Sequence, residues 1–141
     1  MNRLLDEVAI ITGAGQGVGR GIARRLSSEG AAVVIAELNE EVGRRTAQEI
    51  HSDFGVKTLF LATDVSSKDS VLSMVETTVK TFGRVDILVN NAWAPSRPSR
   101  LESKPEKHLD RAVGIGLYGP FWAIQAVFPH MRRQGGGRII S

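Results

Sequence analysis

Apolar runs alternate with helix-periodic segments along the chain. The first run, Val8–Thr12, is continuous rather than alternating, which is typical of a strand buried on both faces. After it, Val18, Ile22 and Leu26 recur every fourth residue and predict the buried stripe of an amphipathic helix. A strand that leads directly into a helix is the basic unit of an α/β protein.

The same unit recurs down the chain. Apolar runs predict four more strands, at residues 32–36, 57–63, 85–89 and 138–140. Asn39 is placed to cap a second helix, residues 66–69 resemble a capping box before a third helix that ends at Gly83, and a helical region spans 106 to about 133. Repeated strand–helix units imply a parallel sheet with helices on both faces, which is a Rossmann-like, doubly wound α/β fold.

Four glycines separate the first strand from the first helix: Gly13, Gly15, Gly17 and Gly19. A cluster of glycines marks backbone whose function a Cβ would prevent. Between a strand and a helix, such a turn aims free backbone N–H groups and a helix N-terminus at an anion. The expected ligand is a phosphate or a pyrophosphate, and a glycine-rich turn without a ligand is the alternative.

The spacing of the glycines excludes two phosphate-binding motifs. A P-loop requires Lys-Ser or Lys-Thr after its last glycine, whereas Arg20 follows Gly19 here. The third glycine of a G-x-G-x-x-G fingerprint would fall at Val18 or at Arg20. The pattern that fits is T-G-x-x-x-G-x-G from Thr12. Residues 13–17 also read G-x-G-x-G, as in methyltransferases that bind S-adenosylmethionine, so methyl transfer stays open.

Polar residues end the next three predicted strands. Glu37 follows the second, where a carboxylate can accept hydrogen bonds from a ribose diol. Asp64 follows the third, where it can accept from the exocyclic amine of adenine, and Asn90 and Asn91 follow the fourth. The carboxyl ends of parallel strands meet at one edge of a sheet, which is where ligands bind in such folds. These residues and the glycine turn therefore predict one nucleotide site.

Composition limits the other functions. The 141 residues are 42% hydrophobic and 23% charged, as in an ordinary soluble domain. The net charge of +3 comes from scattered basic residues without interleaved aromatic residues, which does not favour a nucleic-acid surface. There is no cysteine, and the three histidines have no ligand spacing, so no metal site is predicted.

No apolar run approaches the ~20 residues of a membrane span, and a cytoplasmic protein is expected.

From Val8 to Ile140 the chain resembles the short-chain dehydrogenase/reductase family. The resemblance rests on four segments: Thr12-Gly13-Ala14-Gly15-Gln16-Gly17-Val18-Gly19, Asp64-Val65, Asn90-Asn91-Ala92 and Gly137-Arg138-Ile139-Ile140. It implies strand order 3-2-1-4-5 in a single dinucleotide-binding domain of residues 1–141. It also implies a nicotinamide dinucleotide as the cofactor and an alcohol or carbonyl compound as the substrate. The cofactor-binding residues that the resemblance implies are Gly13, Gly15, Gln16, Gly17, Val18, Gly19, Glu37, Leu38, Asp64, Val65, Asn90, Asn91 and Ala92.

Glu37 favours NAD over NADP, because its carboxylate accepts from a 2′-hydroxyl and repels a 2′-phosphate. Two residues depart from the family pattern. Trp93 replaces the glycine of the Asn-Asn-Ala-Gly segment, and its ring either stacks over the nucleotide or turns outward. Gly116 stands at the position of the family's catalytic asparagine, in Gly116-Leu117-Tyr118-Gly119, and has no side chain to support a proton-relay water.

The catalytic residues of the family are not matched. Its serine follows the Gly-Arg-Ile-Ile strand, and Ser141 comes too early on that strand to match it. Its Tyr-x-x-x-Lys pair has no counterpart, because the one tyrosine, Tyr118, is followed four residues later by Trp122. Tyr118 is interpreted as a packing residue on a helix.

The chain is therefore expected to be the cofactor-binding part of an NAD(P)-dependent oxidoreductase, truncated after the fifth strand and inactive alone, with a homo-oligomer as a further expectation. A fragment, a truncated gene product and one chain of a two-chain enzyme are not distinguished. A non-catalytic NAD-binding module and, with less support, a methyltransferase are the alternatives.

Overall fold

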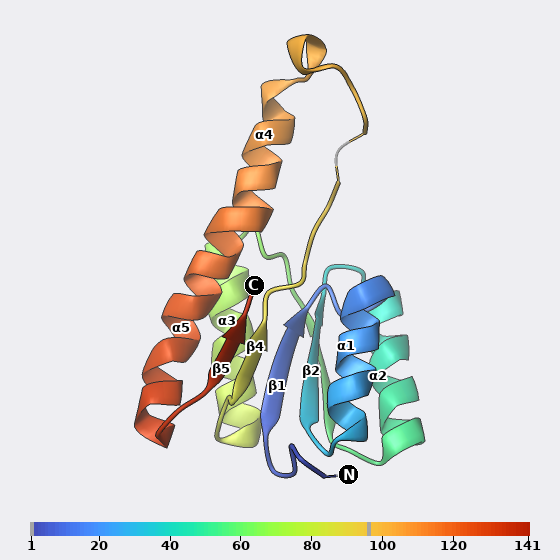
Figure 1. The fold of residues 1–141 in the computed structure, drawn as a ribbon, viewed down its shortest axis with the longest axis vertical. Coiled ribbons are helices and arrows are strands. Elements are labelled where there is room, and N and C mark those ends of the chain that lie inside the picture. Colours follow the sequence, from blue (N-terminus) through green and yellow to red (C-terminus); the bar gives the residue numbers. More distant parts are fainter. Residues whose placement is uncertain (1, 96) are drawn as a thin grey trace.

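The computed structural model describes residues 2–95 and 97–141 and shows a sheet covered by helices on both faces (Figure 1). In chain order the elements are β1 (Val8–Thr12), α1 (Gly17–Ser28), β2 (Ala32–Glu37), α2 (Glu40–Phe54), β3 (Thr58–Ala62), α3 (Lys68–Phe82), β4 (Ile87–Val89), the 3-10 turn η1 (Leu101–Ser103), α4 (Glu106–Val113), the π-helical turn η2 (Gly114–Tyr118), α5 (Gly119–Gln134) and β5 (Arg138–Ile140).

The five strands form one parallel sheet in the order β3-β2-β1-β4-β5, which confirms the predicted order. β1 has the predicted bounds and is buried along its whole length. β4 is shorter than the predicted 85–89. The N–H of Val85 donates to the side-chain oxygen of Gln134 at 3.1 Å and not to a neighbouring strand. Asn39 caps α2 as predicted, its side chain accepting from the N–H of Val42 at 3.1 Å.

Each face of the sheet has its own apolar core. On one face, α1 and α2 cover β1 and β2 with side chains such as Ala23, Ala47 and Ile50. On the other face, α3 and α5 pack together over β1 and β4 through Val71, Met74, Val75, Ala123, Val127 and Met131. Because all the strands are parallel, their carboxyl ends lie at the same edge of the sheet (Figure 1).

The predicted stripe of α1 is wrong by one residue. Gly19, Ala23 and Ser27 form its buried face, whereas Val18 is 74% exposed. Ile22 and Leu26 flank that face and are partly buried. Small side chains face the sheet because α1 begins in close contact with the ends of β1 and β4, where a larger side chain at Gly19 does not fit.

α4, η2 and α5 form one continuous helix, Glu106–Gln134, whose first turns project beyond the sheet (Figure 1). Its length and composition suffice to cross a membrane, contrary to the expectation that no segment would reach that threshold. Core helices of soluble proteins meet the same criterion, and the inner face of α5 packs on α3, so this is weak evidence for a membrane. The π-helical turn ends directly before Gly119, whose missing Cβ lets the helix approach the carbonyl oxygen of Val65.

Candidate functional site

The glycine turn presents unpaired backbone donors at the start of α1. Gly13 and Gly17 both have positive φ, at 64° and 57°, which favours glycine. The turn is held to β2, since the N–H of Gly13 donates to the carbonyl of Ala36 at 2.8 Å. In the described part of the chain, the N–H groups of Gly17, Val18 and Gly19 have no hydrogen-bond partner, and Gln16 does not cap the helix with its side chain. A helix N-terminus in this state attracts an anion.

Asn91 joins the end of β4 to this turn. Its Nδ2 donates to the carbonyl oxygens of Thr12 (3.0 Å) and Gly13 (3.2 Å). In return, the Oγ1 of Thr12 accepts from the N–H groups of Asn91 and Ala92, both at 3.0 Å. A Cβ on Gly19 would collide with the Gly13 carbonyl and the Asn91 amide, so this contact requires glycine. The two strand ends therefore form one rigid unit.

Glu37 lies against the opposite side of the turn. Its Oε2 accepts from the N–H of Gly15 at 2.9 Å, and its Oε1 accepts from the N–H of Asn39 at 3.2 Å. A Cβ on Gly15 would lie 2.7 Å from the Glu37 Cγ, so a glycine is needed for the carboxylate to lie this close. Each carboxylate oxygen keeps acceptor capacity, because a carboxylate offers about four lone-pair sites.

Asp64 stands at the end of β3 with its side chain ordered by the following turn. Its Oδ1 accepts from the backbone N–H and the hydroxyl of Ser66, at 2.9 and 2.6 Å. The exposed side chain of Leu38 and the side chain of Val65 lie at the same edge of the sheet. This part of the edge therefore combines apolar surface with one carboxylate.

These residues enclose a hollow of about 370 Å³ at the carboxyl edge. The sequence-predicted residues that line it are Gly13, Gln16, Val18, Gly19, Glu37, Leu38, Asp64, Val65, Asn91 and Ala92. The other three predicted residues do not line it. Gly15 lies behind Glu37, Gly17 begins α1, and Asn90 donates from Nδ2 to the hydroxyl of Ser141 at 3.0 Å.

Sequence reasoning missed Thr63, Ala94, Arg111 and Ile115, which also line the hollow. Arg111 and Ile115 come from α4 and η2, and no motif or spacing in the chain points to them. Thr12, predicted as part of the turn pattern, has a second function as the acceptor that fixes Asn91. The sequence signal for this function was the position of Thr12, a polar residue that ends a buried strand directly before the first glycine.

Trp93 lies between the two alternatives expected for it. It lines the nucleotide-sized hollow and also a neighbouring apolar hollow beside α4, and 63% of the residue is exposed. A Cβ on Gly116 would lie 3.4 Å from the Trp93 ring, so the two departures from the family pattern are in contact. Tyr118 stacks on Trp122 with ring centroids 5.4 Å apart, yet 52% of the residue is exposed.

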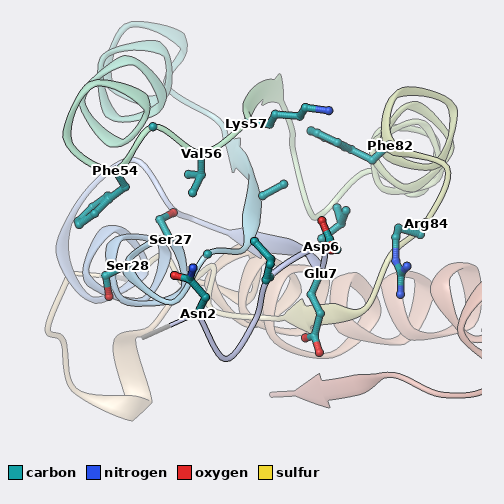
Figure 2. A pocket seen from close by; sticks show the side chains of 15 residues that line it. Asn2, Asp6, Glu7, Ser27, Ser28, Phe54, Val56, Lys57, Phe82 and Arg84 are labelled. Carbon is teal, nitrogen blue, oxygen red and sulfur yellow. The ribbon is translucent and has the colours of Figure 1, made fainter.

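A larger hollow, of about 600 Å³, lies at the opposite edge of the sheet (Figure 2). Ser28, Phe54 and Phe82, which line it, are the last residues of α1, α2 and α3. Helix C-termini carry negative partial charge, which disfavours an anion, and the charged side chains that line this hollow are of both signs: Asp6, Glu7, Lys57 and Arg84. A phosphate therefore fits the smaller hollow, where α1 begins. Among the described residues, no group of His, Asp or Glu is placed to hold a metal ion.

Comparison with known proteins gives consistent results. A family model described as short chain dehydrogenase matches residues 7–141. The chain is 42% identical over 137 residues to the short chain dehydrogenase/reductase astE of Aspergillus oryzae, covering 97% of this chain and 52% of that protein. It is 39% identical over 138 residues to an uncharacterized oxidoreductase of Thermotoga maritima, with 98% and 53% covered. The NAD⁺-bound xylitol dehydrogenase structure matches with a TM-score of 0.92 and 30% identity, over 97% of this chain and 52% of that one. The chain thus spans about half the length of the curated relatives it matches.

Proposed function

The chain belongs to the short-chain dehydrogenase family, and from this we propose that it binds a nicotinamide dinucleotide, NAD in preference to NADP, at the carboxyl-edge hollow. The observation that carries the proposal is the Glu37 carboxylate, held by two backbone N–H groups beside the open N-terminus of α1. The neighbouring xylitol dehydrogenase structure, which is described as NAD⁺-bound, supports the same class of cofactor.

The residues of the hollow fit the three parts of such a ligand. The unpaired N–H groups of Gly17, Val18 and Gly19 suit a pyrophosphate. Glu37 suits the ribose diol, since its oxygens keep acceptor capacity beyond their two backbone donors. Asp64, Val65 and Leu38 suit adenine, with apolar surface for the ring and a carboxylate for the amine. Residues 1–141 would then act as one dinucleotide-binding domain.

The preference for NAD follows from charge at Glu37. A 2′-phosphate would bring negative charge against a carboxylate whose position is fixed by Gly15 and Asn39. Arg20, the nearest arginine in the chain to the glycine turn, is ion-paired with Glu49 of α2. That pairing reduces its capacity to compensate for the phosphate.

The reaction that we propose for the completed enzyme is hydride transfer between the cofactor and an alcohol or carbonyl compound. The bound cofactor supplies the hydride acceptor or donor, and the protein must move a proton at the substrate oxygen. These 141 residues contain one tyrosine, Tyr118, whose ring stacks on Trp122 and has no lysine four residues later. We therefore expect this chain alone to bind NAD without turnover, which a non-catalytic NAD-binding module would also do.

A cytoplasmic, homo-oligomeric protein completes the proposal. The chain contains no cysteine, in keeping with a reducing compartment. Support for an oligomer comes from the exposed apolar side chains of η2 and α5. The match to the short chain dehydrogenase model leaves the methyltransferase alternative without support beyond the G-x-G-x-G spelling.

The proposal is tested by titrating the chain with NAD, NADP and S-adenosylmethionine while recording tryptophan emission. Trp93 lines the hollow, so its emission responds to a bound ligand. We expect NAD to bind more tightly than NADP. Glu37→Ser should lower NAD affinity by about tenfold or more and remove the preference, because a charge-assisted hydrogen bond is worth about 1.5–3 kcal/mol. Glu41→Ser, at an exposed position of α2 outside the hollow, is the control. Equal or tighter NADP binding by the unmodified chain would refute the NAD preference, and binding of S-adenosylmethionine alone would refute the proposed cofactor.

A further inference from the structure

The two backbone polar groups of Gly15 are both held by side chains that lie far along the chain. Its N–H donates to Glu37, as described above, and its carbonyl oxygen accepts from the Oγ1 of Thr46 at 2.7 Å. Thr46 belongs to α2 and is 1% exposed, and it does not line the nucleotide hollow. Gly15 is buried as well, so no solvent competes for either hydrogen bond.

A helical threonine ordinarily bonds to its own helix, where its hydroxyl reaches the carbonyl one turn earlier. Thr78, equally buried in α3, does this and donates to the carbonyl of Met74 at 2.8 Å. Thr46 instead reaches a carbonyl 31 residues away in the chain. The two threonines are thus equally buried and both donate to a backbone carbonyl, but only Thr46 joins its helix to a distant segment.

The reach of Thr46 depends on how closely α2 approaches the sheet. Gly43, one turn before Thr46, packs against Phe60 so tightly that a Cβ there would collide with the ring. The same Cβ would lie 3.0 Å from the Cβ of Glu37. This contact brings the side of α2 against the end of β2 and sets Thr46 within hydrogen-bond distance of the glycine turn.

We propose that Thr46 is a positioning residue for the dinucleotide, an inference that rests on the proposed function. By holding the Gly15 carbonyl, Thr46 fixes the Gly15–Gln16 peptide and so restricts rotation at Gly15. This restriction keeps the N–H of Gly15, which belongs to the preceding peptide, directed at the Glu37 Oε2. The carboxylate then stays in one position, with Asn39 N–H on its other oxygen, ready to accept from the ribose diol. Thr46 therefore controls the affinity for NAD, and its discrimination from NADP, without touching the ligand.

The test compares Thr46→Val, which keeps the shape and removes the hydroxyl, with Thr46→Ser, which keeps the hydroxyl. Thr46→Val leaves the buried Gly15 carbonyl unpaired, so we expect NAD to bind about tenfold more weakly. NADP affinity should change less, so the ratio of NAD to NADP affinity falls. Thr46→Ser should restore both values to within about twofold. Thr78→Val removes an equally buried hydroxyl and should leave affinity and ratio unchanged. Calorimetric titration with each cofactor measures all of these.

The outcomes separate this inference from the proposed function. If the unmodified chain binds no NAD, the proposed function fails and this inference with it. If the unmodified chain binds NAD and Thr46→Val keeps both the affinity and the ratio, Thr46 is no positioning residue. If Thr46→Val does not fold, amide hydrogen exchange in the unmodified chain decides. The Gly15 amide must then exchange far more slowly than the unpaired Gly17 amide, and equal exchange rates would overturn the proposal.

Discussion

The two sides of β1 differ in how completely the described residues cover them. On the side of β2 and β3, α2 lies close enough to the sheet to require Gly43, and two ion pairs, Arg20–Glu49 and Arg24–Asp53, join α1 to α2. On the side of β4 and β5, β5 is largely exposed. There, η2 and α5 expose Leu117, Tyr118, Phe121 and Phe128.

The difference shows which part of the site depends on this chain alone. Glu37 and the end of β3 are held by contacts within the well-covered side. The glycine turn is held from both sides, by Ala36 of β2 and by Asn91 at the end of β4. The side of β4 and β5 combines the apolar helix face with the two departures, Trp93 and Gly116. The resemblance implies a Tyr-x-x-x-Lys pair for proton transfer, and these 141 residues contain no such pair.

The largest effect is expected where α1 meets the ends of β1 and β4, the contact that joins the two sides. Gly19→Ala puts a Cβ into the Gly13 carbonyl and the Asn91 amide, which must move apart. We expect loss of measurable NAD binding and destabilisation by about 1–3 kcal/mol, the usual cost of overpacking. Urea denaturation and calorimetric titration measure the two effects.

Gly21→Ala is the matched control for this change. Gly21 lies in the same helix, and a Cβ there meets nothing within 4 Å. Alanine should therefore stabilise the chain by up to about 1 kcal/mol through its higher helix propensity and leave NAD binding intact. Unchanged NAD binding by Gly19→Ala would show that the two strand ends are not the rigid unit described.

A smaller effect is expected on the exposed side. Leu117, Phe121 and Phe128 share one face of the helix, and an exposed apolar stripe of this kind favours association. We expect the chain to elute as an oligomer or a broad mixture in size-exclusion chromatography. Phe121→Glu combined with Phe128→Glu should shift it toward monomer with a stability change within about 0.5 kcal/mol.

Leu72→Glu, at an isolated exposed position on α3, serves as the control and should leave the elution unchanged. A sharp monomeric peak for the unmodified chain would remove the contrast between the two sides. It would also weaken the homo-oligomer proposed above.

The smallest effect concerns the N-terminal segment, which is tied to the end of α1. Arg3 donates to Glu29 at 2.8 Å and Arg25 donates to the same carboxylate oxygen at 2.6 Å. The Arg3 hydrogen bond, opposed by burial and aided by Arg25, lowers the pKa of Glu29 from 4.5 to about 2. A carboxyl with a lowered pKa in the folded state stabilises the protein above its unfolded pKa. That contribution is lost as the pH falls from about 4.5 to about 2.

Thermal unfolding between pH 5 and pH 2 checks this. Glu29→Gln should lose less stability over that interval than the unmodified chain, and Glu41→Gln, at an exposed position of α2, should follow the unmodified chain. Parallel curves for Glu29→Gln and the unmodified chain would contradict it. Both ion pairs of Glu29 involve largely exposed arginines, so the effect is expected to be modest.

Much of the fold could be predicted because local patterns determine it. Continuous apolar runs predict strands buried on both faces, and strand–helix alternation predicts parallel pairing, which all the paired strands show. The strand order was implied by the family resemblance, and the order β3-β2-β1-β4-β5 confirms it. The residues at the strand ends could be predicted to lie close together, because the carboxyl ends of parallel strands meet at one edge of the sheet. Glu37, Asp64 and Asn91 do line one hollow with the glycine turn.

Only the tertiary structure decided which residues connect these parts. Val18 was predicted to be buried, but the close approach of α1 to β1 and β4 turned the small residues Gly19 and Ala23 inward. Thr46 and Arg111 have no local signal, since their positions depend on how α2 and α4 pack. A sequence pattern records which side chains prefer burial and where the backbone turns. Which buried hydroxyl meets which carbonyl depends on distances between elements, and packing alone sets those distances.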